Sequence, residues 1–220
     1  MKISAVIVAA GSGTRMNAGK NKVFLEILGK TILERTVSVF NECKMVDEII
    51  VVTNETHEAE KILKGYEKVT DITCGGSVRG ESVQNGLSKA TGDIVAIHDG
   101  ARALITCEYI EKVLLSAIEN GAAALGVKCK DTLKLRDENG FIKETVNREF
   151  LYNIQTPQVF GLSAIKGMYE KCDEVFTDDC LVAEKFGVKV KIVDSSYDNI
   201  KITTPEDLHL AEKILEERGE

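Results

Sequence analysis

The stretch that decides the fold reads Ala5-Val6-Ile7-Val8-Ala9-Ala10-Gly11-Ser12-Gly13-Thr14-Arg15-Met16. A short apolar run passes into small residues and two glycines, and an arginine follows. A basic segment, Lys20-Asn21-Lys22, comes next. Small residues let backbone amides approach anionic oxygens, and nearby cations offset the negative charge. The stretch therefore indicates a strand followed by a loop that binds a polyphosphate.

Outward from this stretch, apolar runs alternate with amphipathic segments. The runs predicted as strands are Ile3–Ala9, Glu48–Thr53, Val69–Thr73, Asp93–Ile97, Ala122–Val127 and Val188–Val193. The segments predicted as helices are Thr31–Cys43, Glu55–Lys64, Val78–Ala90, Cys107–Asn120, Leu162–Cys172, Asp178–Phe186 and a last helix that begins at Pro205 behind an N-cap at Thr204. Near-continuously apolar strands separated by helices predict an α/β, Rossmann-like fold, with a mostly parallel sheet and helices on both faces. Ligands of such sheets bind beyond the carboxyl ends of the strands, where the first glycine loop would lie.

One insertion departs from the alternation of strands and helices. Thr132–Arg136 and Phe141–Val146 each alternate apolar and polar residues, and Asp137-Glu138-Asn139-Gly140 between them has the composition of a turn. This pattern predicts a β-hairpin. A lone hairpin is marginally stable in water, so we expect a protruding arm at about residues 130–148 that packs on something else. A second subunit of a homodimer is the expected partner, and the alternative is a hairpin lying on its own domain.

Size and composition set the class of protein. The chain has 220 residues, of which 44% are hydrophobic and 29% charged, which suits one soluble domain over residues 1–220. The net charge of −7, without a broad basic surface, argues against a nucleic-acid partner. No signal peptide or apolar run of membrane-spanning length is visible, so we expect no membrane association. Six scattered cysteines without a C-x-x-C pair suit reduced thiols in the cytoplasm.

The glycines after the first strand complete neither of two common nucleotide motifs. The third glycine of G-x-G-x-x-G is absent, because position 16 is Met, and no G-K-S/T follows. A nicotinamide-dependent dehydrogenase and a P-loop enzyme are therefore disfavoured. A small-residue loop with Arg15 and Lys22 just beyond it remains, and the plainer alternative is a strand-to-helix turn.

Eight motifs occur in order along nearly the whole chain. They are Ala9-Ala10-Gly11-Ser12-Gly13-Thr14-Arg15-Met16 with Lys22, Gly75-Gly76-x-x-Arg79-x-x-Ser82-Val83, His98-Asp99-Gly100-Ala101-Arg102, Asp131-Thr132, Thr145-Val146-Asn147-Arg148, Gln155-Thr156-Pro157-Gln158, Thr177-Asp178-Asp179 and Asp198-Asn199-Ile200-Lys201. Together they resemble the 2-C-methyl-D-erythritol 4-phosphate cytidylyltransferase family, within the sugar-phosphate nucleotidyltransferases. The resemblance implies that the phosphate of methylerythritol phosphate attacks the α-phosphorus of CTP and releases pyrophosphate. It also implies Mg²⁺, bound mainly through the CTP phosphates.

The resemblance assigns roles to individual residues. Two cations match the pair that stabilises the α-phosphate in the transition state, Arg15 and Lys22. Six residues match the CTP site, in which the first four cradle the triphosphate and the last two hold the cytosine and ribose: Ala10, Gly11, Ser12, Gly13, Gly76 and Ser82. Six match the polyol-phosphate site: Asp99, Arg102, Thr132, Arg148, Thr156 and Lys201. Thr132 and Arg148 are expected to act in the neighbouring subunit, and Asp99 is also a candidate metal ligand.

Several readings stay open at this stage. Asp99 and Arg102 could form only a buried ion pair, and Asp178 and Asp179 could cap a helix instead of supporting the pocket with Thr177. His98 is expected to pack on its strand, since the incoming phosphate is already an anion and needs no base. Ribitol-5-phosphate cytidylyltransferase, another sugar-phosphate nucleotidyltransferase and a non-catalytic nucleotide-binding module are the competing functions.

Three positions depart from the family pattern. Asn21 stands where a proline usually precedes the lysine, and a looser loop around Lys22 is expected. Ser77 replaces the usual Asp after Gly76, which bears on nucleotide affinity. Ala103 replaces a proline after Arg102, which should loosen that turn. None of the three removes a charged catalytic group.

Overall fold

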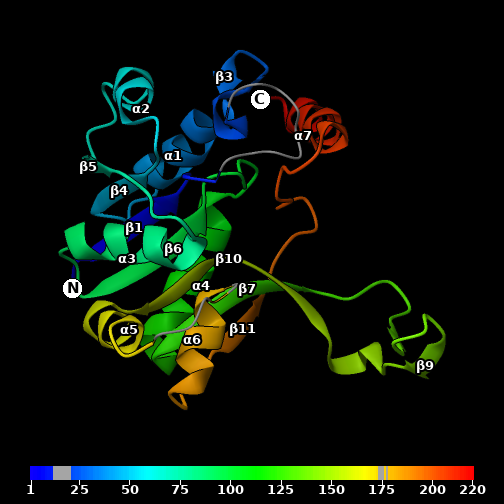
Figure 1. Cartoon of the computed structure of the whole chain (residues 1–220). Helices are drawn as coiled ribbons and strands as arrows, with labels where there is room; N and C mark the ends of the chain where they lie inside the picture. The colour runs from blue at the N-terminus through cyan, green and yellow to red at the C-terminus, as the bar shows by residue number, and fades with distance from the viewer. Residues whose placement is uncertain (12–20, 173–175, 177) are drawn as a thin grey trace.

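A seven-stranded sheet forms the centre of the computed structural model, which describes residues 1–11, 21–172, 176 and 178–220 (Figure 1). Its strands, in spatial order, are β11 (Lys191–Asp194), β7 (Ala122–Lys128), β10 (Tyr152–Gly161), β6 (Ile94–Asp99), β1 (Ile3–Val8), β4 (Glu48–Val52) and β5 (Val69–Thr73). Strand β10 runs antiparallel to both of its neighbours, and the other paired strands are parallel. The predicted mostly parallel α/β sheet is therefore confirmed.

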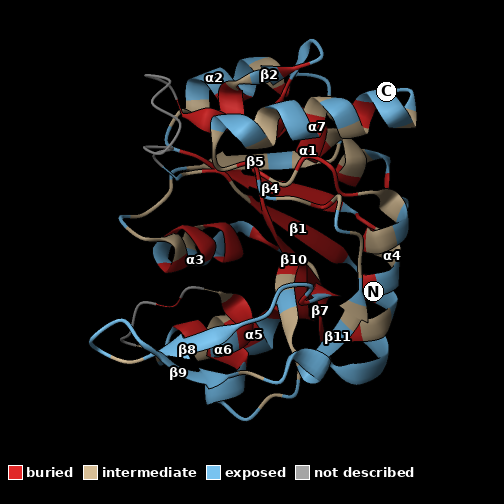
Figure 2. Cartoon of the chain, turned by 90° about the vertical axis from the view of Figure 1, so that its right-hand side faces the viewer, coloured by how far each residue is buried: buried red, intermediate tan, exposed pale blue. Residues whose placement is uncertain are grey.

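Helices cover both faces of this sheet, as predicted from the apolar strands. One face carries α1 (Ile32–Glu42), α2 (Thr56–Ile62) and α4 (Cys107–Asn120), and the other carries α3 (Arg79–Lys89), α5 (Leu162–Tyr169) and α6 (Asp179–Lys185). Strand β1 shows how one strand serves two layers, since Ala5 and Ile7 join the first cluster and Val6 joins the second. Figure 2 shows the buried central strands between the two layers. Continuous apolar runs follow from burial on both sides.

A third, smaller core lies beside the main sheet. It joins α7 (Pro205–Arg218) to a short hairpin of β2 (Glu26–Ile27) and β3 (Lys30–Thr31), through Ile27, Leu104, Ala211 and other side chains. Helix α7 begins at Pro205 with a capping box between Thr204 and Asp207, so its predicted start is confirmed. A 3-10 helix, η2 (Lys22–Phe24), precedes this hairpin, and its Val23 and Phe24 join the cluster on the first face of the main sheet.

The predicted hairpin is present and projects from the body of the molecule (Figure 1). It pairs β8 (Lys134–Arg136) with β9 (Ile142–Thr145), and a 3-10 helix, η3 (Arg148–Phe150), follows. Both strands are exposed on every residue, and Phe141, Ile142 and Phe150 are 72%, 68% and 80% exposed. A hairpin with this much bare apolar surface fits the expectation of an arm that packs on a second subunit, which stays a prediction.

Three features of the fold were not predicted, and the first is the short β2–β3 hairpin. Strand β10 contains Gln155, Thr156, Pro157 and Gln158, whose polarity and proline conceal a buried strand. Strand β11 is shorter than the predicted run from Val188 to Val193. Within the part of the chain that the structure describes, no helix is both long and apolar enough to cross a bilayer.

Candidate active site

Four parallel strands end at one edge of the sheet, and their loops form the site. Strand β1 continues into Ala9-Ala10-Gly11, β4 into Thr53-Asn54, β5 into Cys74-Gly75-Gly76, and β6 ends at Asp99. Because β10 runs the opposite way, it brings Thr156 alongside the end of β6. The Asp99 backbone N–H donates to Thr156 Oγ1 at 3.0 Å. The site thus lies where the sheet topology predicts a ligand.

A cavity of about 550 Å³ opens at this edge. The sequence-predicted residues that line it are Ala10, Gly11, Lys22, Gly76, Ser82, Asp99 and Lys201. Ser12, Gly13 and Arg15 lie outside the described residues. The two lysines, which are far apart in sequence, therefore share one cavity with the small residues after β1.

The loop after β5 is built for close approach to the end of β1. A Cβ on Gly75 would lie 2.2 Å from the Ala10 Cβ, so only glycine fits there. Asn54 spans the two loops, because its Nδ2 donates to the Ala10 carbonyl at 3.4 Å and its Oδ1 accepts from Gly75 N–H at 3.1 Å. The Ser82 hydroxyl accepts from Gly76 N–H at 3.0 Å and donates to the Val78 carbonyl. These two hydrogen bonds of the Ser82 hydroxyl thus shape the cavity wall itself.

Ser77 and Glu81 close the same loop at the head of α3. The Glu81 carboxylate accepts from both the backbone N–H and the hydroxyl of Ser77, at 2.6 and 2.8 Å. These hydrogen bonds lower the pKa of Glu81. Ser77 therefore lines the cavity with its hydroxyl already bonded to Glu81. The Asp that the family usually has at this position would instead bring a negative charge.

Lys22 is buried and lines the large cavity. Its Nζ donates to the Ile202 carbonyl at 2.7 Å. The preceding Asn21 is also buried: its Nδ2 donates to the Ala9 carbonyl and to Glu55 Oε2, both at 3.1 Å, and its Oδ1 accepts from Val23 N–H. These hydrogen bonds tie Asn21 to the end of β1 and to the residue before α2, and the looser loop expected around Lys22 stays a prediction.

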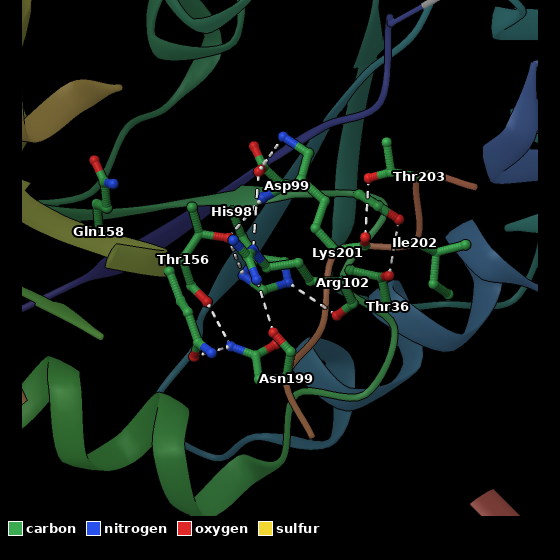
Figure 3. A network of polar contacts seen from close by, with 12 residues as sticks. Thr36, His98, Asp99, Arg102, Thr156, Gln158, Asn199, Lys201, Ile202 and Thr203 are labelled. Carbon is green, nitrogen blue, oxygen red and sulfur yellow. Dashed lines mark hydrogen bonds and ion pairs between the residues drawn. The ribbon is translucent and has the colours of Figure 1, made fainter. Parts of the chain in front are cut away.

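Asp99 is the centre of the charged cluster, shown in Figure 3. Its carboxylate contacts Lys201 Nζ at 2.7 Å, Arg79 Nε at 3.3 Å and Arg102 Nε at 3.9 Å. Burial would raise the pKa of Asp99, but the charges of Arg79, Lys201 and Arg102 hold it below the ordinary value. Asp99 is therefore an anion that gathers three cations.

A second cavity of about 200 Å³ adjoins this cluster. Four of the residues predicted to bind the polyol phosphate line it: Asp99, Arg102, Thr156 and Lys201. Arg79, Asp99 and Lys201 line both cavities and form their shared wall. The Asp99–Arg102 ion pair exists, yet both residues also face this cavity, so the pair and a binding role are compatible.

The loop that carries Lys201 is fastened to β6 and β10. Asn199 Nδ2 donates to Gln155 Oε1 and to the Thr156 carbonyl, at 3.0 and 3.1 Å, and the Asn199 carbonyl accepts from Arg102 Nη1 at 2.7 Å. The backbone N–H of Ile202 donates to the Ala101 carbonyl at 2.9 Å. These bonds hold the turn after Asp99, and Ala103 is buried in the small core. The loosening expected at Ala103 stays a prediction.

His98 is fully buried and packs against Phe40, with ring centroids 4.9 Å apart, as predicted. Its Nε2 lies 3.2 Å from the Arg102 carbonyl, which can only accept, so Nε2 carries the proton. Its Nδ1 then accepts from the Thr156 hydroxyl at 3.1 Å. Burial lowers the pKa of His98 to about 3, so the ring is neutral and positions its neighbours.

Some predicted residues are not brought to the cavities. Thr132 and Arg148 lie at the base of the exposed arm and line neither cavity, and Arg148 Nη1 donates to the Lys130 carbonyl. Asp178 is the N-cap of α6 and accepts from Leu181 N–H at 2.7 Å, while it also lines the small cavity. Thr177 lies outside the described residues. The helix-cap reading thus holds for Asp178 and fails for Asp179, which is buried beside Arg79.

Sequence reasoning overlooked Arg79, Asn54 and Asn199 as site residues. Arg79 had a signal, because it stands in the quoted motif with Gly75, Gly76 and Ser82. Asn199 also stands in a quoted motif, together with Lys201, but its bonds to Gln155 and Thr156 are not visible in any local pattern. Asn54 contacts backbone groups of two other loops, and no local pattern reveals such contacts.

The site gathers cations around two adjoining cavities, which suits the joining of two anionic substrates. Comparisons with known proteins agree with this chemistry. The sequence model of the family described as 2-C-methyl-D-erythritol 4-phosphate cytidylyltransferase matches residues 3–217. Proteins with that name from Caldanaerobacter subterraneus subsp. tengcongensis and Clostridium botulinum are 48% and 45% identical, each over 98% of this chain and 99% or 98% of their own length.

Solved structures show the same relationship. The crystal structure of 4-diphosphocytidyl-2C-methyl-D-erythritolsynthase from Anaerococcus prevotii is 36% identical and superposes with a TM-score of 0.87, over 98% of this chain and 96% of that one. The 2-C-methyl-D-erythritol 4-phosphate cytidylyltransferase from Thermus thermophilus is 27% identical, with a TM-score of 0.81 over 98% and 100% of the two chains. The chain therefore belongs to the 2-C-methyl-D-erythritol 4-phosphate cytidylyltransferase family.

Proposed function

We propose that the two cavities divide the substrates of cytidylyl transfer between them. The chain is a cytidylyltransferase that joins CTP and 2-C-methyl-D-erythritol 4-phosphate in isoprenoid biosynthesis. The large cavity takes CTP, and the small cavity takes the methylerythritol phosphate. The observation that carries this proposal is the shared wall of Arg79, Asp99 and Lys201, where groups bound on the two sides meet.

On the nucleotide side, the small residues after β1 accept the triphosphate. Ala10 and Gly11 line the cavity without bulky side chains, so backbone amides can approach phosphate oxygens. Gly76 and Ser82 wall the part proposed for the cytosine and ribose. Lys22, together with Arg15 outside the described residues, is assigned to the α-phosphate.

On the acceptor side, the reaction needs charge compensation more than proton transfer. The attacking phosphate is already an anion, and it must approach another anion. Lys201 and Arg102 line the small cavity, where their positive charges would face an incoming phosphate. Thr156 lines the same cavity. These cations lower the electrostatic cost of bringing the two phosphates together.

The donor set of the large cavity fits Mg²⁺ carried by the nucleotide. Among the described residues, no three His, Cys, Asp or Glu side chains cluster in a way that could hold a metal ion, and Asp99 is the carboxylate of the described lining. Mg²⁺ in such enzymes commonly binds through one or two carboxylates plus substrate phosphates. We therefore propose Asp99 as its protein ligand. When bound, the ion would neutralise triphosphate charge and assist the departure of pyrophosphate.

The assembly proposed is a homodimer formed through the arm. The exposed Phe141, Ile142 and Phe150 need an apolar partner surface, and an arm of this shape can reach a neighbouring subunit. Thr132 and Arg148 at the arm's base are then assigned to the acceptor site of the neighbour. We also propose one domain over residues 1–220 and a cytoplasmic location, which the six scattered cysteines support.

Pyrophosphate release with matched substrates tests this assignment. The purified protein is incubated with each of the four NTPs and with methylerythritol phosphate or ribitol 5-phosphate, the acceptor that the family match disfavours. Release is expected with CTP and methylerythritol phosphate.

Lys22→Met should lower kcat by at least about 100-fold with the fold intact, since it removes a charge that is assigned to the transition state. The exposed Lys30→Met is the matched control, and near-normal turnover in Lys22→Met would reject the assignment of the large cavity.

A further inference from the structure

The carboxylate of Asp179 is fully buried beneath the small cavity, and none of the roles above uses it. It accepts from Arg79 Nη1 at 3.0 Å, from Arg79 Nη2 at 2.8 Å and from the Tyr169 hydroxyl at 2.5 Å. Its own backbone N–H donates to Gln158 Oε1 at 2.9 Å. The side chain is therefore fixed by residues of α3 and α5, and the backbone by β10, although Asp179 lines neither cavity.

Arg79 connects this buried carboxylate to the shared wall. It is the first residue of α3, it lines both cavities, and its Nε donates to Asp99 Oδ1 at 3.3 Å. Burial would lower the pKa of Arg79, but the charges of Asp179 and Asp99 raise it above the ordinary value. The guanidinium thus keeps its charge while two carboxylates fix its plane.

We propose that Asp179 is a positioning residue for cytidylyl transfer, which locks the Arg79 guanidinium in the wall between the cavities. A guanidinium has five N–H groups, and three of those of Arg79 hold Asp179 and Asp99. Two N–H groups of Arg79 remain, and the orientation of the guanidinium that carries them in the shared wall depends on Asp179. This inference rests on the proposed assignment of the cavities to CTP and methylerythritol phosphate.

A purely structural role for Asp179 makes a different prediction. Buried ion pairs are seldom more stabilising than apolar packing of the same volume, so stability alone gives a weak reason for this pair. If Asp179 only stabilised the fold, its substitution would lower the unfolding midpoint and leave the kinetic constants of the folded enzyme unchanged. A positioning role changes the kinetic constants at a temperature where every variant is folded, and it acts only through Arg79.

A double-mutant cycle separates these roles. Wild type, Asp179→Asn, Arg79→Gln and the double variant are compared by kcat and by KM for each substrate, with folding checked by circular dichroism. Each single change should lower kcat/KM by at least about tenfold, because displaced positioning groups cost that much or more. The double variant should be no worse than Arg79→Gln. Wild-type constants in Asp179→Asn, or effects that multiply in the double variant, would overturn the proposal.

Glu48→Gln is the matched control. Glu48 is also a buried carboxylate in a polar network, but it lies at the start of β4, at the opposite edge of the sheet from the cavities, and binds Lys2, Ser4 and Thr91. This variant should lower the unfolding midpoint with unchanged kcat and KM. The Lys22→Met variant separates a failure of the cavity assignment from a failure of the role proposed for Asp179. If Lys22→Met keeps its turnover, the cavity assignment fails and this inference fails with it; if it loses turnover while the cycle is flat, only the role of Asp179 is wrong.

Discussion

The Lys201 ammonium lies 2.7 Å from Asp99 Oδ2 in the wall common to both cavities. Its side chain is 41% exposed, whereas that of Asp99 is 10% exposed. An exposed cation held by a buried anion keeps its place before any ligand arrives. The pair therefore presents positive charge to an incoming phosphate without having to reorganise.

Removing this charge should weaken the acceptor site first. Lys201→Met is expected to raise KM for methylerythritol phosphate by about tenfold or more, because a charge-assisted hydrogen bond contributes about 1.5–3 kcal/mol. The KM for CTP should change less. The exposed Lys213→Met on α7, which removes the same charge from a residue that lines neither cavity, is the control. Equal effects on both KM values would contradict the assignment of Lys201 to the acceptor.

Asn21 should position Lys22 through its side chain. Its backbone φ is −61°, a value that proline also adopts, and its amide ties Ala9 to Glu55. Asn21→Ala removes the hydrogen bonds and frees the backbone, so kcat should fall severalfold. Asn21→Pro restores the backbone restraint and should recover most of the turnover. Steady-state kinetics with saturating CTP measure both, and an Asn21→Ala enzyme as fast as wild type would sink this explanation.

Because His98 is buried in its neutral form, we expect the protein to lose stability in weak acid. Burial lowers its pKa to about 3 from an ordinary 6.5, so between these values the unfolded chain binds a proton that the folded chain does not. The unfolding free energy should therefore fall as pH drops below 6.5, by up to about 1.4 kcal/mol per pH unit. Urea unfolding between pH 7 and 5 measures this slope. The pKa values of Asp99 and Glu48 are lowered by their partners, so these two groups reduce the unfolding free energy only below about pH 4.5, near the ordinary carboxyl pKa.

The matched comparison for this prediction is His98→Gln. It should be less stable than wild type at pH 7, because it disturbs the contacts with Thr156 and Arg102. Its stability should nevertheless vary less between pH 7 and 5. Equal slopes in the two proteins would show that another group titrates.

Mixed dimers test whether the arm completes the neighbour's site. Lys22→Met and Arg148→Ala subunits are each expected to be nearly inactive as pure proteins. A dimer containing one of each has one site with both changes and one with neither, so random mixing should restore about a quarter of wild-type activity. Subunit exchange is verified by native mass spectrometry. An unchanged, additive activity in verified mixed dimers would place Arg148 in its own subunit's site.

The sequence predicted what repeats regularly and missed what depends on distant partners. Helix α4 has the predicted bounds, because an amphipathic period and a glycine stop are local signals. Strand β10 was hidden, because Gln155 and Gln158 look unsuited to a buried strand until their partners are known: Asn199 for the first, and the backbone N–H groups at the start of α6 for the second. The β2–β3 turn was missed for a related reason, since Leu28 adopts a φ of +46° that its residue type does not suggest.

The candidate site shows the same division. Lys22, Gly76, Asp99 and Lys201 were predictable from motifs, and the structure places them around one cavity. The pairing of Arg79 with Asp179 spans 100 residues of sequence, and nothing in either segment indicates it. Local patterns reveal which side chains carry charge, but the tertiary fold decides which of them neutralise each other.

The direction of β10 has a consequence for how the arm could have arisen. Strands β7 and β10 are consecutive, antiparallel neighbours in the main sheet, so the residues between them form the tip of one long hairpin. That tip leaves the sheet at the same rim as the cavities. Lengthening a surface loop adds little closure entropy and disturbs no buried layer. A simple insertion at this position therefore extends beside the cavities, whereas a parallel strand in place of β10 would have sent the same insertion over a helical face.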